Sequence, residues 1–97
     1  MIIYEVNLKV SNSVISQFKI WLDEHIKIML TYDGFIKYEI FDVINKDKDN
    51  TLIVIHYCLE TMKHYDDYIS KYSYKMRDDG KNKFKDEFEA NRRILKI

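Results

Sequence analysis

Residues suited to proton transfer occur at alternating positions of segments with strand-like patterns. Glu5 and Asn7 lie in the segment 1–10, Glu39 in 35–44 and His56 in 51–59. Side chains two positions apart in a strand point to the same face, so these four could meet on one face of a sheet. Carboxylates beside a histidine can transfer protons. The simpler interpretation, which we favour, is a polar patch hydrogen-bonded across strands or across a dimer interface.

The histidines and the single cysteine lack the spacing of a metal site. His25, His56 and His64 form no H-x-x-x-H pair, and Cys58 has no second cysteine, so the usual zinc patterns are missing. The loop 45–51 has oxygen-bearing side chains at alternate positions, but it lacks the glycine and the final carboxylate of a calcium loop. We expect no metal and no cofactor.

The composition bounds the class of protein. The 97 residues make one domain, 1–97. Lys and Arg number 16 and so do Asp and Glu, so no net charge attracts nucleic acid or an anionic membrane. No segment approaches the roughly 18 apolar residues of a membrane span, and no basic region precedes an apolar one at the N-terminus. We expect a cytoplasmic protein without membrane contact, for which nucleic-acid binding is disfavoured.

Periodicity places these residues on strands and helices. Alternation predicts strands at 1–10, 35–44, 51–59 and 92–97. Spacings of three and four predict a helix of about 18 residues from Val14 and a second helix from Thr61. Ser11, Asn12 and Ser13 are expected to cap the first helix and Gly34 to follow it. Asp78–Gly80 is expected to interrupt the second, before a short helical segment that carries Phe84 and Phe88.

The order β-α-β-β-α-β predicts an α+β, ferredoxin-like fold with four antiparallel strands and both helices on one face. The other face would stay open and carry many apolar side chains: Ile3, Glu5, Asn7, Lys9, Phe35, Lys37, Glu39, Phe41, Val43, Leu52, Val54, His56 and Cys58. This surface is too apolar for solvent. We expect a homodimer with sheet packed on sheet, in which Lys9 and Lys37 could pair with the carboxylates.

Several short motifs together carry a family resemblance over nearly the whole chain: Met1–Val6, Trp21–Leu22, Met29–Leu30, Gly34–Phe35, Tyr68, Met76–Arg77, Phe84, Phe88 and Arg92–Leu95. With them the chain resembles a family of small bacterial proteins known as domain of unknown function 4286. The resemblance implies a ferredoxin-like monomer, related in shape to dimeric α+β barrel proteins. It brings no established activity, so no catalytic residue follows from it.

The same resemblance draws attention to Arg77, Arg92 and Arg93 as ligand-binding candidates. An arginine fork suits a carboxylate or a phosphate. Each arginine could instead form an ion pair, for example Arg92 with Glu89 or Arg77 with a helix neighbour. Both interpretations stay open.

Trp21 is a ligand-binding candidate by residue type. Some haem-degrading members of the dimeric α+β barrel superfamily use an asparagine, a tryptophan and a histidine, and Asn7, Trp21 and His64 resemble that set. The apolar neighbours of Trp21 along its helix make packing at the core or its rim the simpler interpretation.

Three functions remain as alternatives. The first is a small homodimer that binds a small molecule or a partner, with no assigned chemistry. The second is a dimeric-barrel oxygenase, cofactor-independent or haem-using, with a closed pocket between sheet and helices that Asn7, Trp21 or His56 would reach. The third is an amino-acid-sensing regulatory module, although Ser11–Ser13 has no glycine where such modules bind their ligand.

Overall fold

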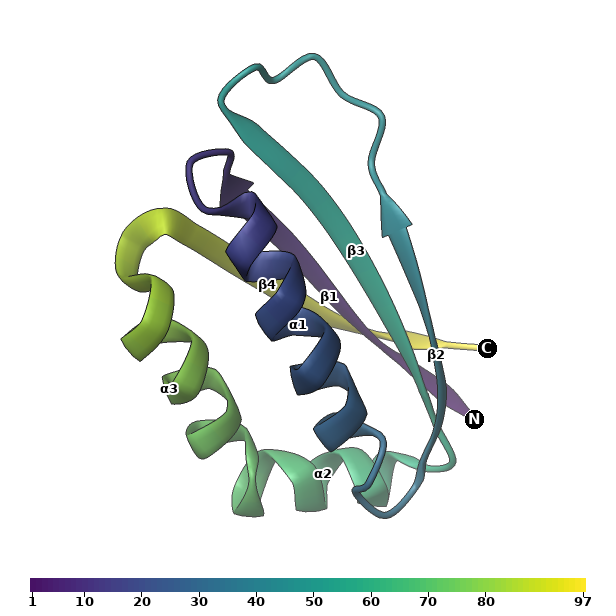
Figure 1. The fold of residues 1–97 in the computed structure, drawn as a ribbon. Helices are drawn as coiled ribbons and strands as arrows, with labels where there is room; N and C mark the ends of the chain where they lie inside the picture. The colour runs from purple at the N-terminus through teal and green to yellow at the C-terminus, as the bar shows by residue number, and fades with distance from the viewer.

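A four-stranded antiparallel sheet carries all the helices on one of its faces (Figure 1). The computed structural model describes residues 1–97. In chain order the elements are β1 (Ile2–Ser11), α1 (Ile15–Met29), β2 (Phe35–Asp42), β3 (Asn50–Leu59), α2 (Met62–Lys71), α3 (Ser73–Phe84), a 3-10 turn (Lys85–Glu87) and β4 (Phe88–Lys96). The strand order is β2-β3-β1-β4. The predicted ferredoxin-like fold is confirmed.

The central strand β1 fixes which side chains share a face. Glu5 lies opposite His56 of β3 and Arg93 of β4, and the next residue, Val6, lies opposite Arg92. Neighbouring side chains of a strand point to opposite faces. Arg92 therefore belongs to the face covered by the helices, and Arg93 to the open face.

The core lies between the sheet and the helices. Alternate β1 residues from Tyr4 to Val10 face α1, whose buried residues are Phe18, Leu22, Ile26 and Met29. These four are spaced by four, four and three positions, so they form one stripe along α1. The alternating side chains of β1 and the apolar stripe of α1 therefore pack together in one layer, as the sequence patterns predicted.

The edge strands depart from prediction in two places. A register shift between Phe35 and Lys37 turns Phe35 toward the helices, where it is buried, and not onto the open face as expected. β2 ends at Asp42, so Val43 lies beyond the strand. At the other edge, β4 begins at Phe88, which was expected in a helix. The bulge in β2 puts Phe35 on the opposite face from Lys37, Glu39 and Phe41, which lie on the open face as expected. Alternation alone does not reveal such an extra residue.

The second helical region divides at Tyr72, which ends α2 and begins α3. Asp78–Gly80, the expected interruption, lies inside α3. Thr61 caps α2 as predicted, because its side-chain oxygen accepts from the backbone N–H of His64. The expected Ser11–Ser13 cap of α1 is wrong, since Val14 takes the N-cap position and gives no side-chain bond. Gly34 has the left-handed φ of 84° that was expected after α1.

No helix covers the second face of the sheet (Figure 1). Seven of the eight residues of β2 are exposed. Of its large apolar side chains, Phe41 lies on the open face opposite Val54, whereas Ile40 lies on the helix side near Leu22 and Ile26. In the structure no helix combines the length and the apolar character needed to cross a membrane.

Candidate functional site

The open face carries a closed hydrogen-bonded group, the Glu5 cluster, made of Glu5, Asn7, His56 and Arg93. The Nε of Arg93 donates to Glu5 Oε1 at 2.6 Å, and Asn7 Nδ2 donates to the same oxygen at 2.9 Å. The second carboxylate oxygen of Glu5 lies 2.7 Å from His56 Nε2. These contacts follow from the register, which sets Glu5 directly opposite His56 and Arg93. The lysines expected as partners are not used.

The surroundings of Glu5 hold its carboxyl group in the ionised form. Hydrogen bonds from Arg93 and Asn7 lower the pKa of Glu5 from 4.5 to about 2, against the opposing effect of burial. A carboxylate with this pKa is a weak base at neutral pH. Glu39 lies opposite His56 but is exposed and forms no hydrogen bond to the cluster. The geometry therefore suits cross-strand stabilisation better than proton transfer.

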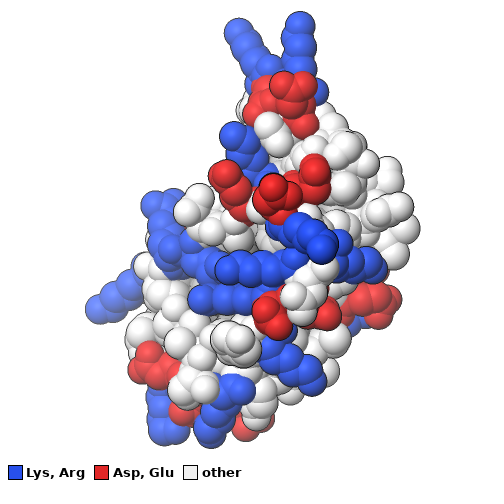
Figure 2. Space-filling view, turned by 90° about the vertical axis from the view of Figure 1, so that its left-hand side faces the viewer, with Lys and Arg blue, Asp and Glu red and all other residues white.

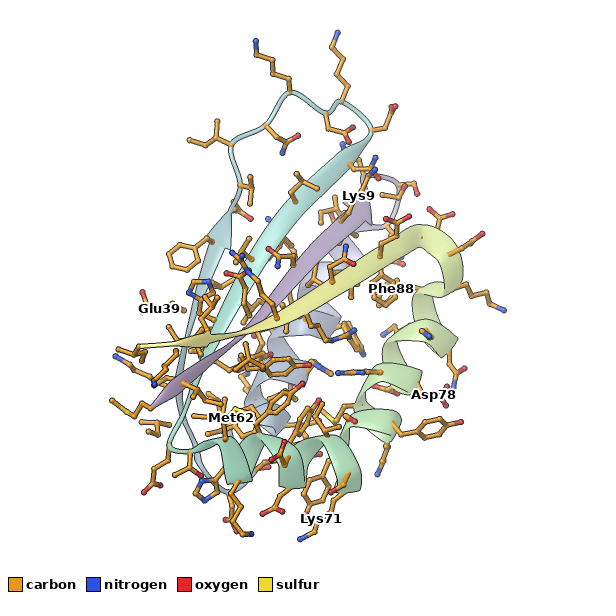
Figure 3. All side chains as sticks on the ribbon, turned by 180° about the vertical axis from the view of Figure 1, so that it is seen from behind. Lys9, Glu39, Met62, Lys71, Asp78 and Phe88 are labelled. Carbon is orange, nitrogen blue, oxygen red and sulfur yellow. The ribbon has the colours of Figure 1, made fainter.

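A second polar group lies on the other side of the sheet, in a cavity that we call the Trp21 pocket. It has a volume of about 40 Å³, room for a few water molecules at roughly 10–15 Å³ each. Its walls come from β1, β3, β4, α1, α2 and α3: Tyr4, Val6, Leu8, Trp21, Leu22, His25, Met29, Ile55, Tyr57, Tyr68, Met76, Arg77, Gly80, Phe88 and Arg92. Figure 3 shows Phe88 with its ring in the space between β4 and α3, whereas Glu39 lies on β2.

Two arginines reach the Trp21 pocket without a carboxylate partner. Arg77 of α3 donates from Nη2 to the hydroxyl of Tyr4 at 3.2 Å, and its Nε is buried without a hydrogen-bond partner. Neither Arg77 nor Arg92 has an acidic oxygen within 4.0 Å. The ion pairs that the sequence left open as one interpretation of these two residues are therefore not formed. A buried N–H that lacks a partner costs free energy, so the pocket favours an incoming acceptor.

Trp21 and His25 line the pocket on the side of α1, and Asp79 of α3 contacts Trp21. Trp21 Nε1 donates to Asp79 Oδ2 at 3.2 Å, and the rings of Trp21 and His25 lie 4.6 Å apart. Burial lowers the pKa of His25 from 6.5 to about 4, and Arg92 acts in the same direction against Asp79. His25 is therefore a neutral imidazole at neutral pH, able both to donate and to accept a hydrogen bond.

Gly80 lets α3 approach Trp21. A Cβ atom at this position would lie 2.9 Å from Trp21 Cη2, closer than side chains pack without a shift. Glycine inside a helix costs stability compared with alanine, and here it makes room for the indole. Packing of α3 against the indole offsets that cost, so the helix continues through Asp78–Gly80.

Other residues considered together from the sequence lie apart. Asn7 is in the Glu5 cluster on the open face, Trp21 is in the pocket, and His64 bonds to Thr61 at the start of α2. No pocket wall includes both Asn7 and Trp21, and His56 too lies on the open face. At the β1–α1 turn, Asn12 bonds to the Lys48 carbonyl and the Thr51 hydroxyl. No group of three or more His, Cys, Asp or Glu could hold a metal ion.

Sequence reasoning missed His25 and Gly80 as pocket residues, and Asp79 as the hydrogen-bond partner of Trp21. A signal existed for His25, because it lies four positions after Trp21 and so on the same helix face. Asp79 and Gly80 had no such signal. Their place depends on how α3 packs against α1, which the pattern of neither helix reveals.

Several solved structures are similar to the chain in fold. A Deinococcus radiodurans protein proposed to be an antibiotic biosynthesis monooxygenase has a TM-score of 0.78 and 10% identity, covering 100% of this chain and 92% of that one. SnoaB, a cofactor-independent oxygenase from Streptomyces nogalater, has a TM-score of 0.69 and 10% identity, covering 99% and 92%. A dimeric ferredoxin-like protein from an uncultured marine organism has a TM-score of 0.73 and 16% identity, covering 100% and 94%.

At the level of sequence, none of the curated proteins matches. A family model does match, and it spans residues 1–97, the whole chain that forms the sheet, the Glu5 cluster and the Trp21 pocket. The protein therefore belongs to the family described as domain of unknown function DUF4286.

Proposed function

We propose that the protein binds a small apolar acid in the Trp21 pocket, with the apolar part against the aromatic walls and the acid group toward Arg77 and Arg92. Eleven of the fifteen lining residues are hydrophobic, which suits an apolar ligand with few polar contacts. Met29 and Met76 are in the wall, and the flexible side chain of methionine adapts to ligands larger than the empty space.

The observation that carries this proposal is the buried Nε of Arg77, which has no partner although it lies beside an apolar cavity. Arginine recognises carboxylates through two parallel hydrogen bonds, and Nε is one of the donors in that fork. Arg92 adds a second positive charge without an ion pair. The tyrosine hydroxyls stay protonated, because burial raises the pKa of Tyr57 and of Tyr68.

The proposal is tested by binding of phenylacetate, with 2-phenylethanol as its neutral counterpart. Trp21 is the only tryptophan and lines the pocket, so its fluorescence reports occupancy. We expect phenylacetate to bind about tenfold more tightly than the alcohol, since a charge-assisted bond is roughly twice as strong as a neutral one. Arg77→Gln should remove this preference and Lys83→Gln should keep it. Equal affinity for both compounds in the wild-type protein contradicts the proposal.

A second candidate function is cofactor-independent oxygenation, favoured by the neutral imidazole of His25 in the same pocket. A bound anion raises the pKa of a neighbouring histidine, so occupancy would prepare His25 to accept a phenolic proton. SnoaB shares the fold. The test is oxygen uptake with 1-naphthol, a phenol that O₂ converts to the quinone: one oxygen atom enters the ring and the other leaves as water. Uptake that His25→Gln lowers supports this function, and uptake equal to that without protein contradicts it.

We further propose that two copies pack through their open sheet faces in the cytoplasm. Apolar side chains such as Phe41 and Val54 lie side by side there without a covering element, and such surface usually marks an interface. One similar structure is described as a dimeric ferredoxin-like protein. The unpaired thiol of Cys58 suits a reducing compartment. Sedimentation at micromolar concentration tests the assembly, and a strictly monomeric protein contradicts it.

A further inference from the structure

The Trp21 pocket adjoins a wide groove between α3 and β4, which we call the α3–β4 groove. Arg77, Phe88 and Arg92 line both. The remaining groove residues are Lys81, Lys85, Asp86, Glu89, Ala90 and Asn91. The groove has a volume of about 700 Å³, against about 40 Å³ for the pocket. A ligand that entered the pocket from this side would leave any longer part of itself in the groove.

The α3–β4 groove is positively charged and its cations are not neutralised. Arg77, Lys81, Lys85 and Arg92 face two carboxylates, Asp86 and Glu89. None of the four cations forms an ion pair with any acidic group of the chain. Figure 2 shows Lys and Arg side chains in a band across the side of the molecule where α3 and the start of β4 lie. Because the chain as a whole has no net charge, this band is a local concentration.

The backbone of Lys85 gives an independent reason to assign a role to this groove. Lys85 has a φ of 52° and a ψ of −126°, and it is the only residue other than glycine with a positive φ. This combination of positive φ and negative ψ lies outside the left-handed helical region, and residues other than glycine rarely adopt it. A lysine here strains the backbone, and strained residues of this kind concentrate at ligand sites. Its side chain lines the groove.

We propose that the α3–β4 groove binds a phosphate group, so that the ligand of this protein is a phosphate ester whose small apolar group occupies the Trp21 pocket. The proposal rests on the proposed function for the pocket and names the class of its ligand. A phosphate offers three acceptor oxygens and more charge than a carboxylate, which matches cations from α3, the turn after it and β4. The groove adjoins a small aromatic pocket, which suits a small molecule better than a nucleic-acid strand.

The test compares three probes on the full chain: phenylacetate, phenyl phosphate and inorganic pyrophosphate. We expect phenyl phosphate to bind about tenfold more tightly than phenylacetate, because it adds charge-assisted bonds in the groove. Lys81→Gln and Lys85→Gly should each weaken phenyl phosphate by about threefold to tenfold and leave phenylacetate unchanged. Lys83→Gln, which removes the same charge outside the groove, is the matched control and should change neither.

Lys85→Gly separates a binding role from a structural one. Glycine adopts the observed φ without strain, so this variant should unfold about 4–8 °C higher than the wild-type protein, as expected for relief of a modest strain in a chain of this size. Higher stability together with weaker phosphate binding supports the proposal. Unchanged phosphate binding in Lys85→Gly and Lys81→Gln overturns it.

The two proposals can fail separately. If phenylacetate does not bind but pyrophosphate does, and Lys81→Gln weakens it, the phosphate site stands and the pocket proposal falls. If phenylacetate binds and phenyl phosphate binds no better, the pocket proposal stands and the phosphate site falls. A short single-stranded oligonucleotide that binds far more tightly than phenyl phosphate overturns the small-molecule class in favour of nucleic acid.

Discussion

Charged side chains have partners within the chain on one face of the sheet and lack them on the other. In the Glu5 cluster, one carboxylate accepts hydrogen bonds from Arg93 and Asn7 and contacts His56, so the charges are satisfied within the chain. In the Trp21 pocket, Arg77 and Arg92 have no carboxylate partner. A polar group that is satisfied internally contributes to the fold, and one that is left unsatisfied at a cavity is available to a ligand. The difference identifies the pocket as the better functional candidate.

The largest expected effect concerns what covers the open face. Val54→Glu places a carboxylate beside Phe41 and Asn7, where a partner copy would bury it. An unpaired buried charge costs several kcal/mol, so the dissociation constant of the dimer should rise by about 100-fold or more. Sedimentation equilibrium measures this change. Ile20→Glu, the same kind of substitution on the exposed surface of α1, is the control and should leave the dimer intact.

A dimer that survives Val54→Glu would show that the open face is not the interface. The Glu5 cluster would then be an ion network that faces solvent, and the open face would have no role in assembly. A dimer that dissociates places that cluster inside the assembly.

Two neighbouring arginines provide the next test, because Arg92 and Arg93 are adjacent in β4 and point to opposite faces. Arg92→Gln should weaken phenylacetate binding about tenfold, through loss of a charge-assisted contact in the pocket. It should leave stability nearly unchanged. Arg93→Gln should lower the unfolding temperature by a few degrees, because Glu5 loses its principal partner, and it should leave binding unchanged. Titration of Trp21 fluorescence and thermal unfolding measure the two properties.

Each arginine variant is the control for the other. If both variants weaken phenylacetate binding equally, the two arginines do not differ in their role, and the assignment of Arg93 to stability alone is wrong.

The sequence supported the open-face cluster more fully than the pocket, and the reason is physical. Strand alternation has a period of two, so it assigned Glu5, Asn7 and His56 to one face before any contact was known. The pocket depends on how helices pack. Gly80 was expected to break a helix because its role, making room for Trp21, exists only once α3 lies against α1.

The bulge at Phe35 was invisible for a related reason. The extra residue changes the face of one side chain without changing the composition of the segment. Arg77 and Arg92 were named from their residue type, but whether they would pair was left open. That question depends on whether a carboxylate lies within reach in space, and their sequence neighbours Asp78 and Glu89 do not provide one.

The smallest effect, and the one that separates the two faces most directly, is the acid dependence of stability. The folded state lowers the pKa of Glu5 from 4.5 to about 2, chiefly through its bond from Arg93. Folding therefore favours the ionised carboxylate, and its contribution is present above pH 4.5 and lost as the pH falls toward 2. The side chain of Arg93 is largely exposed to solvent. Solvent therefore screens its attraction to Glu5, and the contribution of Glu5 to the free energy of unfolding is reduced to about 1–2 kcal/mol.

The contribution of His25 to stability is lost at higher pH values than that of Glu5. Burial lowers its pKa from 6.5 to about 4, so folding favours the neutral imidazole. The unfolded chain binds more protons between these values, and stability falls as the pH is lowered from 6.5 toward 4, by about 1–2 kcal/mol. The free energy of unfolding, measured with urea at a series of pH values, checks both. In His25→Gln it should no longer fall between pH 6.5 and 4, and in Glu5→Gln it should no longer fall between pH 4.5 and 2. If Glu5→Gln flattened the upper range as well, the two faces would be electrostatically coupled through the sheet, and their separate roles could not be maintained.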